Sequence, residues 1–284
     1  MLALRNNLTS NTYNIQKPKY SNPSFRSNYQ IMYDTIEKCN KTPYATTFFR
    51  NDLDWSQFVK LIFRVFRDAE KANIVCVGCS DGTEPASLLL KMCQKREYKN
   101  NPDKYTIKAY DINQGLIDSA KTGKFKLINN FNNIVDVVNI FFNVIKGYNK
   151  DYFIKDSYLM LAEHLKPKIT YEKKDIIDVV SELPKDEKVV LMTRNIFPYL
   201  ISFPCISEEH ISKLFSELSK LKEGSILVIG QYDKDKFPDI ETSFFSLGYK
   251  ECGVRNCYKK VGQSRQTILN YIRSFFIKNC FIVK

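Results

Sequence analysis

Two short runs of sequence, about 30 residues apart, most constrain how this chain can fold. They are 74–85, IVCVGCSDGTEP, and 106–116, TIKAYDINQGL. Each run begins with apolar, strand-forming residues, turns into a helical pattern, and places carboxylates at that turn. In α/β folds, nucleoside cofactors bind at the carboxyl ends of the strands. The two runs therefore predict an α/β fold with a cofactor site at this edge of its sheet.

The turn of the first run carries acids where a nucleotide phosphate would need bare backbone N–H groups. Its glycines, Gly78 and Gly82, are spaced G-x-x-x-G, which differs from the dinucleotide-binding G-x-G-x-x-G and from the phosphate-binding G-K-[ST] motif. Asp81 and Glu84 would repel a phosphate but attract a cation, such as the sulfonium or α-ammonium group of S-adenosylmethionine. Asp111, after the second strand, would accept hydrogen bonds from ribose hydroxyls. The alternative is that these acids are solvated residues at a helix N-terminus, which the helix dipole also favours.

Length and composition indicate a protein built around one large domain. The chain has 284 residues, 44% of them apolar, and its apolar runs stay shorter than the roughly 18 residues of a membrane span. The N-terminal apolar stretch is too short for a secretory signal, and the eight cysteines are scattered. These features predict a cytoplasmic protein with reduced thiols. Cys76 and Cys79 form a C-x-x-C without a second pair, so no metal site is predicted.

The formal net charge of +12 has two interpretations. The lysines are dispersed along the chain rather than gathered in one arm, which is typical of a solvated surface. The same charge would suit an acidic partner, whether a nucleic acid, an anionic membrane or an acidic protein face. Both interpretations stay open at this point.

Strand and helix patterns divide the chain into three parts. Residues 1–45 are predicted to form an irregular arm, residues 46–262 the folded domain, and residues 263–284 a basic amphipathic extension. Within the domain, the predicted helices are 52–72, 84–95, 113–122, 151–165, 207–221 and 237–247. The predicted strands are 74–79, 106–112, 169–176, 189–194 and 225–230, with a surface loop at 95–104 and a closing hairpin at 248–261. This alternation predicts helices on both faces of a mostly parallel sheet.

Five motifs, kept in order, resemble a known family. They are TTFFR (46–50), SDGTEPASL (80–88), YDINQGLIDSAKTGKF (110–125), TRNIFPYL (193–200) and LKEGSILVIG (221–230). Together they are similar to the chemotaxis-receptor glutamate methyltransferases, the CheR type, over roughly residues 46–262. The resemblance implies a class I methyltransferase, Rossmann-like sheet of seven strands in the order 3-2-1-4-5-7-6. It also implies S-adenosyl-L-methionine as the cofactor.

The resemblance also implies roles for matching residues on the cofactor side. Gly78 and Glu84 would line the methionine end of the cofactor, and Asp111 would hold the ribose. Asp175, which ends the third strand, would lie beside the adenine. Asn195, after the fourth strand, is a further cofactor-binding candidate.

Three residues are the candidate catalytic groups, because the resemblance places them at the reacting end of the site: Arg50, Arg194 and Tyr199. A carboxylate nucleophile is already ionised at neutral pH, so it needs orientation by cations and hydroxyls rather than a general base. The lack of histidine in these motifs agrees with carboxyl O-methylation. Each residue also has a structural interpretation. Arg50 would be an ordinary arginine at a helix start, Arg194 part of a polar strand end, and Tyr199 a core tyrosine.

The chain also departs from the family. Thr83 replaces the first Glu of the family's G-E-E-P, Asp175 replaces an Asn beside the adenine, and Pro198 replaces an Ile before the active-site tyrosine. The family carries a basic helical N-terminal domain that docks the receptor, whereas about 45 irregular residues precede TTFFR here. We therefore expect an acidic protein substrate methylated on glutamate, but poor methylation of an ordinary chemoreceptor.

Two other functions stay open. One is a methyltransferase acting on nucleic acid or a small molecule. The run NIFPY, 195–199, superficially resembles the N-P-P-Y motif of amino-methylating nucleic-acid enzymes, although it is one residue longer and lacks the first proline. The other is a binding module that keeps the fold and cofactor but has lost turnover.

Overall fold

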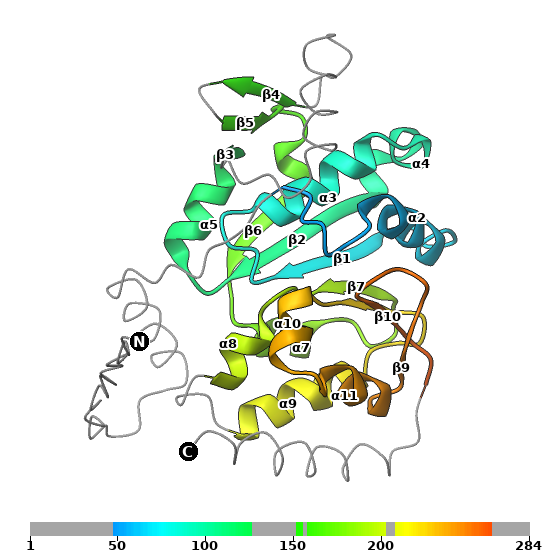
Figure 1. Cartoon of the computed structure of the whole chain (residues 1–284). Helices are drawn as coiled ribbons and strands as arrows, with labels where there is room; N and C mark the ends of the chain where they lie inside the picture. The colour runs from blue at the N-terminus through cyan, green and yellow to red at the C-terminus, as the bar shows by residue number, and fades with distance from the viewer. Residues whose placement is uncertain (1–47, 127–151, 156–157, 203–207, 263–284) are drawn as a thin grey trace, which may run out of the picture.

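The structure is a computed structural model that describes residues 48–126, 152–155, 158–202 and 208–262 (Figure 1). The irregular arm predicted at 1–45 and the amphipathic extension predicted at 263–284 lie outside the described residues.

A seven-stranded, mostly parallel sheet forms the centre of the domain (Figure 1). Its strands, in spatial order, are β6 (Ile169–Lys173), β2 (Tyr105–Asp111), β1 (Ala72–Val77), β7 (Val189–Met192), β8 (Ile226–Val228), β10 (Cys257–Lys260) and β9 (Tyr249–Glu251). The pairs from β6 to β8 are parallel, and β10 is antiparallel to both of its neighbours. The predicted strand order 3-2-1-4-5-7-6 is confirmed.

Helices begin close to where the sequence predicts them, at α2 (Trp55–Val65), α3 (Thr83–Cys93), α5 (Gln114–Lys121), α9 (Glu208–Ser219) and α11 (Ile240–Ser246). Side chains cap two of them, because Asp54 accepts the Gln57 N–H at 3.0 Å and Asn113 accepts the Leu116 N–H at 3.2 Å. Gly123, with a φ of 66°, ends α5 as predicted. Within the described ranges, no helix is both long and apolar enough to cross a membrane.

Three short helices were not predicted: α7 (Ile176–Glu182), α8 (Phe197–Ser202) and α10 (Gln231–Lys236). Each has only six or seven residues, which is too few to show a helical period in the sequence. The predicted surface loop 95–104 is also wrong, because it holds α4 (Arg96–Asn100) and the 3-10 turn η1 (Pro102–Lys104). Tyr98 is buried and anchors this segment to the domain.

Two apolar layers cover the faces of the sheet, and β1 contributes to both. Ile74 and Cys76 face one layer and Val75 and Val77 face the other, as the two-residue period of a strand requires. The first layer contains residues of α2, α3, α4 and α5, and the second contains residues of α7, α8, α9 and α11 (Figure 1). This arrangement confirms helices on both faces.

A small second sheet lies where a helix was predicted. Residues 151–165 contain β4 (Tyr152–Lys155) and β5 (Tyr158–Leu161), which join β3 (Lys124–Lys126) in the antiparallel order β3-β5-β4. The helix prediction was wrong because burial alternates along β5, where Leu159 and Leu161 are buried and their neighbours are half-buried. Both leucines extend the first apolar layer.

Candidate active site

The sheet brings the predicted site residues to one edge. Strands β1, β2, β6, β7 and β8 are parallel, so their carboxyl ends lie together. At or just after these ends come Gly78, Asp111, Asp175, Arg194 and Gly230. Segments that are far apart in the sequence therefore meet at this edge.

The turn after β1 is tightly wound against its neighbours. Gly78, Ser80 and Gly82 all have positive φ angles, of 66°, 53° and 84°. A Cβ at Gly82 would lie 2.8 Å from both the Tyr171 hydroxyl and the Ala120 Cβ, so only glycine fits without displacement. The close packing fixes the start of α3 at the edge of the sheet.

Asp111 is buried at the end of β2. One carboxylate oxygen accepts the Ser80 N–H at 2.8 Å and the other accepts the Asn113 N–H at 2.9 Å, and each oxygen can accept a further hydrogen bond. Burial raises the pKa of Asp111, although these N–H donors lower it, and burial also raises the pKa of Asp81. Within the described part of the chain, neither carboxylate forms an ion pair with lysine or arginine.

These two carboxylates fit a ligand that is cationic and bears hydroxyl groups. A phosphate would meet negative charge without a compensating cation. S-adenosylmethionine offers a sulfonium, an ammonium group and two ribose hydroxyls. The residues after β1 and β2 therefore fit this cofactor.

Glu84 joins the two arginines singled out in the sequence. Arg50 donates to one oxygen of Glu84 at 3.1 Å, and Arg194 donates to the same oxygen at 2.8 Å. A second guanidinium nitrogen of Arg194 donates to Asp52. Glu84 thus has its charge compensated by two guanidinium groups, so it holds the arginines together. Its predicted contact with the methionine end of the cofactor stays a prediction.

The two arginines differ in exposure. The Arg194 side chain is 0% exposed and lies 5.2 Å from the centre of the Trp55 ring, whereas the Arg50 side chain is 19% exposed. Burial lowers the pKa of Arg194, but Glu84 and Asp52 raise it more, so the group stays charged. Arg50 is therefore the arginine that a ligand can reach, and Arg194 supports the network from inside.

Asp52 connects this network to the end of the domain, and sequence reasoning placed it only at the start of a helix. Its second oxygen accepts the Gln231 N–H at 3.0 Å, and its backbone carbonyl accepts a hydrogen bond from the Asn256 side chain at 2.8 Å. Burial raises the pKa of Asp52, but Arg194, the Gln231 N–H and Arg50 lower it further, so the net shift is downward. These partners lie up to 204 positions away, and no local pattern announces them.

Asp233 ties the loops after β7 and β8 together. Its carboxylate accepts N–H groups from Asn195 at 2.6 Å, Gly230 at 2.7 Å and Phe197 at 3.1 Å. The side chain is fully buried, and burial raises its pKa to about 7 although these donors lower it. An acid just after a parallel strand is the signal that identified Asp111, so the sequence did contain a signal for Asp233.

Asn195 has an unusual backbone and a buried side chain. Its φ of 60° lies in the left-handed region, and the N–H bond to Asp233 holds it there. A Cβ at Gly230 would overlap its side-chain oxygen, so Gly230 provides the space for this amide. The amide oxygen is buried and has no hydrogen-bond partner among the described residues.

Tyr199 and Asp175 occupy the remaining predicted positions. Tyr199 is half-buried in α8, and its ring centre lies 6.5 Å from that of Tyr232 in α10. Asp175 follows β6 and caps α7 by accepting the Ile177 N–H at 2.7 Å. The structure thus places both residues beside the same edge, while their contacts with ligands stay predictions.

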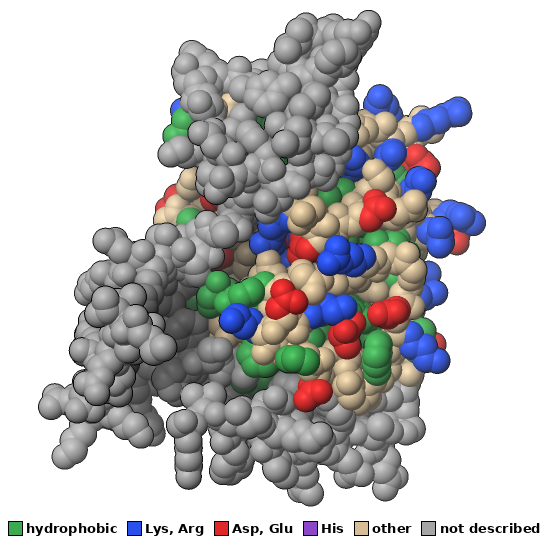
Figure 2. All heavy atoms as spheres, in the orientation of Figure 1, with side chains coloured by type: hydrophobic (Ala, Val, Ile, Leu, Met, Phe, Trp, Pro, Cys, Tyr) green, Lys and Arg blue, Asp and Glu red, His purple; other side chains and the backbone are tan. Residues whose placement is uncertain are grey.

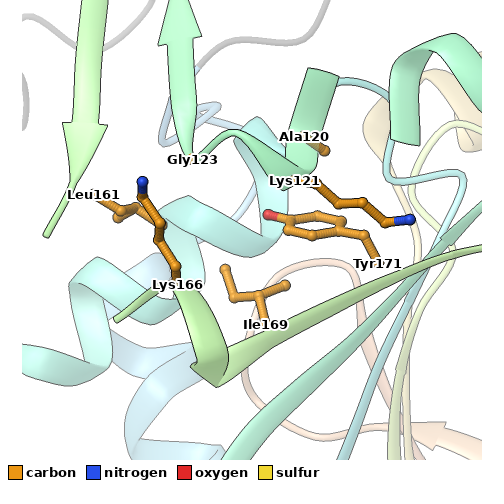
Figure 3. Close-up of a pocket in the computed structure, with 7 residues that line it drawn as sticks. All are labelled: Ala120, Lys121, Gly123, Leu161, Lys166, Ile169 and Tyr171. Carbon is orange, nitrogen blue, oxygen red and sulfur yellow. The ribbon is translucent and has the colours of Figure 1, made fainter. Parts of the chain in front are cut away.

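A cavity of about 80 Å³ lies between α5 and β6 (Figure 3). The Tyr171 hydroxyl points into this region, and it is buried without a hydrogen-bond partner in the described ranges. The lining belongs to α5, β5, β6 and the turns beside them, so the cavity is separate from the arginine network. Its lining residues are Ala120, Lys121, Gly123, Leu161, Lys166, Ile169 and Tyr171.

The sheet order and the acids after β1 and β2 define a class I S-adenosylmethionine-dependent methyltransferase. The model of the CheR methyltransferase S-adenosylmethionine-binding domain matches residues 44–248, which is more than half of the sequence. The chain belongs to the CheR methyltransferase family. Comparison with curated proteins finds no match.

Solved structures resemble the fold at low sequence identity. WbdD, crystallised with a kinase inhibitor, is 13% identical over 74% of this chain and 41% of that chain, with a TM-score of 0.41. A protein from Methanococcus maripaludis, described as an S-adenosyl-L-methionine-dependent methyltransferase, is 12% identical over 88% of this chain and 100% of that chain, with a TM-score of 0.40. The DszA carbon methyltransferase is 14% identical over 73% and 52%, with a TM-score of 0.39. The chain spans less than half the length of the WbdD chains it matches.

Proposed function

We propose that this enzyme methylates a side-chain carboxylate, a glutamate, in an acidic protein. The observation that carries the proposal is the position of Arg50. Its partly exposed guanidinium is held by Glu84 at 3.1 Å, and Glu84 lies in the first turn of the helix that follows the acidic cofactor turn. An oriented cation next to a methyl donor is what an ionised acceptor needs.

The residues divide into a cofactor side and an acceptor side. Asp111 would hold the ribose, Asp175 would lie beside the adenine, and Gly78 and Asn195 would border the methionine end. S-adenosylmethionine supplies a methyl group on a sulfonium, and its transfer to a carboxylate oxygen gives a methyl ester and S-adenosylhomocysteine. The space beside Gly78 is narrow, because a Cβ there would lie 3.1 Å from the Ile196 side chain.

On the acceptor side, Arg50 would bind one carboxylate oxygen, and Tyr199 would donate a hydrogen bond from its hydroxyl to the other. Arg194 would act as a positioning residue, since its buried guanidinium fixes Glu84 and thereby Arg50. No residue needs to remove a proton, because the acceptor is ionised at neutral pH. The described residues of the network include no histidine, which agrees with this chemistry.

The structure gives a reason to favour this function over amino methylation of a nucleic acid. The side-chain oxygen of Asn195 lies buried against Gly230, so the NIFPY run does not present this oxygen at an open surface. An amide that recognises a base would need to reach that base.

The test is methyl transfer from labelled S-adenosylmethionine to acidic peptides that contain glutamate, beside RNA of equal concentration. We expect peptide label that mild base releases as methanol, since a carboxyl ester hydrolyses whereas a methylated amine does not. Arg50→Met should remove most of this activity, and Arg64→Met, at an exposed position in α2, should retain it. Base-stable label, or label only in RNA, would refute the proposal.

A further inference from the structure

Two tyrosines from neighbouring helices stand together beside the arginine network. The ring centres of Tyr199 in α8 and Tyr232 in α10 are 6.5 Å apart, and the ring planes are inclined by 41°. Tyr232 is 41% exposed. Few other large apolar side chains are exposed in the part of the chain that the structure describes. Figure 2 shows hydrophobic side chains exposed among charged ones over the region of α10 and α11.

Both neighbours of Tyr232 in the sequence are hydrogen-bonded into the site. Asp233, which follows it, accepts N–H groups from the residues that lead from β7 into α8. Gln231, which precedes it, donates its N–H at 3.0 Å to Asp52, the ion-pair partner of the buried arginine. The position of Tyr232 relative to the network is therefore fixed by the backbone of its own helix start.

We infer that Tyr199 and Tyr232 form the wall that binds the residue next to the methylated carboxylate, and that this residue is apolar or aromatic. The inference rests on the proposed function and adds a sequence preference to it. Tyrosine rings offer a large apolar contact at low entropic cost, which suits a peptide side chain. The ammonium of Lys236 lies 5.5 Å from the Tyr232 ring centre and adds a cation that suits an acidic segment.

The geometry favours a peptide over a nucleic-acid base. A flat base held between two rings needs the rings to be nearly parallel, whereas these rings are inclined by 41°. A tilted pair forms a shallow, angled surface that an aliphatic or aromatic side chain can fill. The substrate class is thus a polypeptide with an acidic acceptor residue beside an apolar one.

The experiment uses two peptides that differ only beside the acceptor glutamate, where one has leucine and the other glycine. Wild type should show a kcat/KM about tenfold higher for the leucine peptide, since a contact of this kind contributes on the order of 1.4 kcal/mol. Tyr232→Ala should remove the preference by raising KM for the leucine peptide alone, and Tyr232→Phe should keep it. Phe245→Ala is the matched control, because Phe245 is 46% exposed and packs on Tyr258 in β10.

The outcomes separate this inference from the function on which it rests. Absence of ester on both peptides with wild type would refute the proposed function. Ester on both peptides without a preference, or a preference that Phe245→Ala removes equally, would overturn the inference alone. Competition by single-stranded RNA that depends on Tyr232 would assign the wall to nucleic acid and also overturn it. Calorimetry with S-adenosylhomocysteine should give the same affinity for wild type and Tyr232→Ala.

Discussion

Replacing Asp233 by asparagine should change how the stability of this protein depends on pH. Asp233 is fully buried, and burial raises its pKa from 3.8 to about 7. Between these values the folded protein keeps a proton that the unfolded chain has lost. The contribution of this group to stability is therefore largest at low pH and is lost as the pH rises toward 7.

The size of the effect follows from the two pKa values. Between pH 5 and pH 7, ionisation of Asp233 in the unfolded chain lowers the free energy of unfolding by about 2 kcal/mol. Asparagine does not titrate, so the free energy of unfolding of Asp233→Asn does not fall in this way as the pH rises. At pH 5 the variant should be the less stable protein, because its amide N–H groups face the donors of Asn195, Gly230 and Phe197. The difference in the free energy of unfolding between wild type and Asp233→Asn should be smaller by about 2 kcal/mol at pH 7 than at pH 5.

Urea denaturation at pH 5, 6, 7 and 8 measures this gap directly. Asp235→Asn provides the control, since Asp235 is an exposed residue of the same helix and should shift stability little at any of these values. A gap between wild type and Asp233→Asn that stays constant from pH 5 to pH 8 would refute the reasoning. It would mean that the three N–H donors keep the buried carboxylate ionised throughout.

Four further substitutions test the site. Asp111→Ala should weaken binding of S-adenosylhomocysteine by about 1.5–3 kcal/mol through lost charge-assisted hydrogen bonds, and an unchanged affinity in calorimetry would remove Asp111 from the ribose site. Tyr171→Phe should leave the melting temperature equal or higher, because it removes a buried hydroxyl that has no hydrogen-bond partner among the described residues. Gly82→Ala should lower the free energy of unfolding by more than about 1 kcal/mol, because Gly82 has a positive φ and the added Cβ would press against Tyr171. Arg194→Met should cost about 3–5 kcal/mol in urea denaturation, because Glu84 loses a buried partner, and a cost below about 1 kcal/mol would show that the pair adds little.

A mostly parallel sheet with helices on both faces was predictable because strand and helix periods alternate, whereas the strand order followed only from the resemblance to the family. Asp111 was identifiable for a local reason, as an acid that follows an apolar strand. The predicted helix at 151–165 failed where a strand period in β5 and helical spacing overlapped over a few residues. Short helices such as α8 and α10 escaped because one or two turns leave no periodic signal.

The site was predictable only in part, because its side chains are joined by contacts between distant segments. Arg50 and Arg194 were expected at the same end of the site, but nothing in the sequence indicated that Glu84 would bind both. The burial of Arg194 depends on packing against Trp55, which belongs to another element. Asp52 became part of the site through partners that only the folded chain brings near.

The hydrogen bond from Asn256 to Asp52 spans 204 positions, and this span has a consequence for synthesis on the ribosome. A nascent chain that has emerged as far as β8 already contains the five parallel strands, yet it still lacks the turn between β9 and β10 that carries Asn256. Loops of this length close late, because chain entropy opposes them until most other contacts exist. The hydrogen-bond network of Asp52 is therefore completed only after the turn between β9 and β10 has emerged, so a growing chain can pair its five parallel strands before this network is complete.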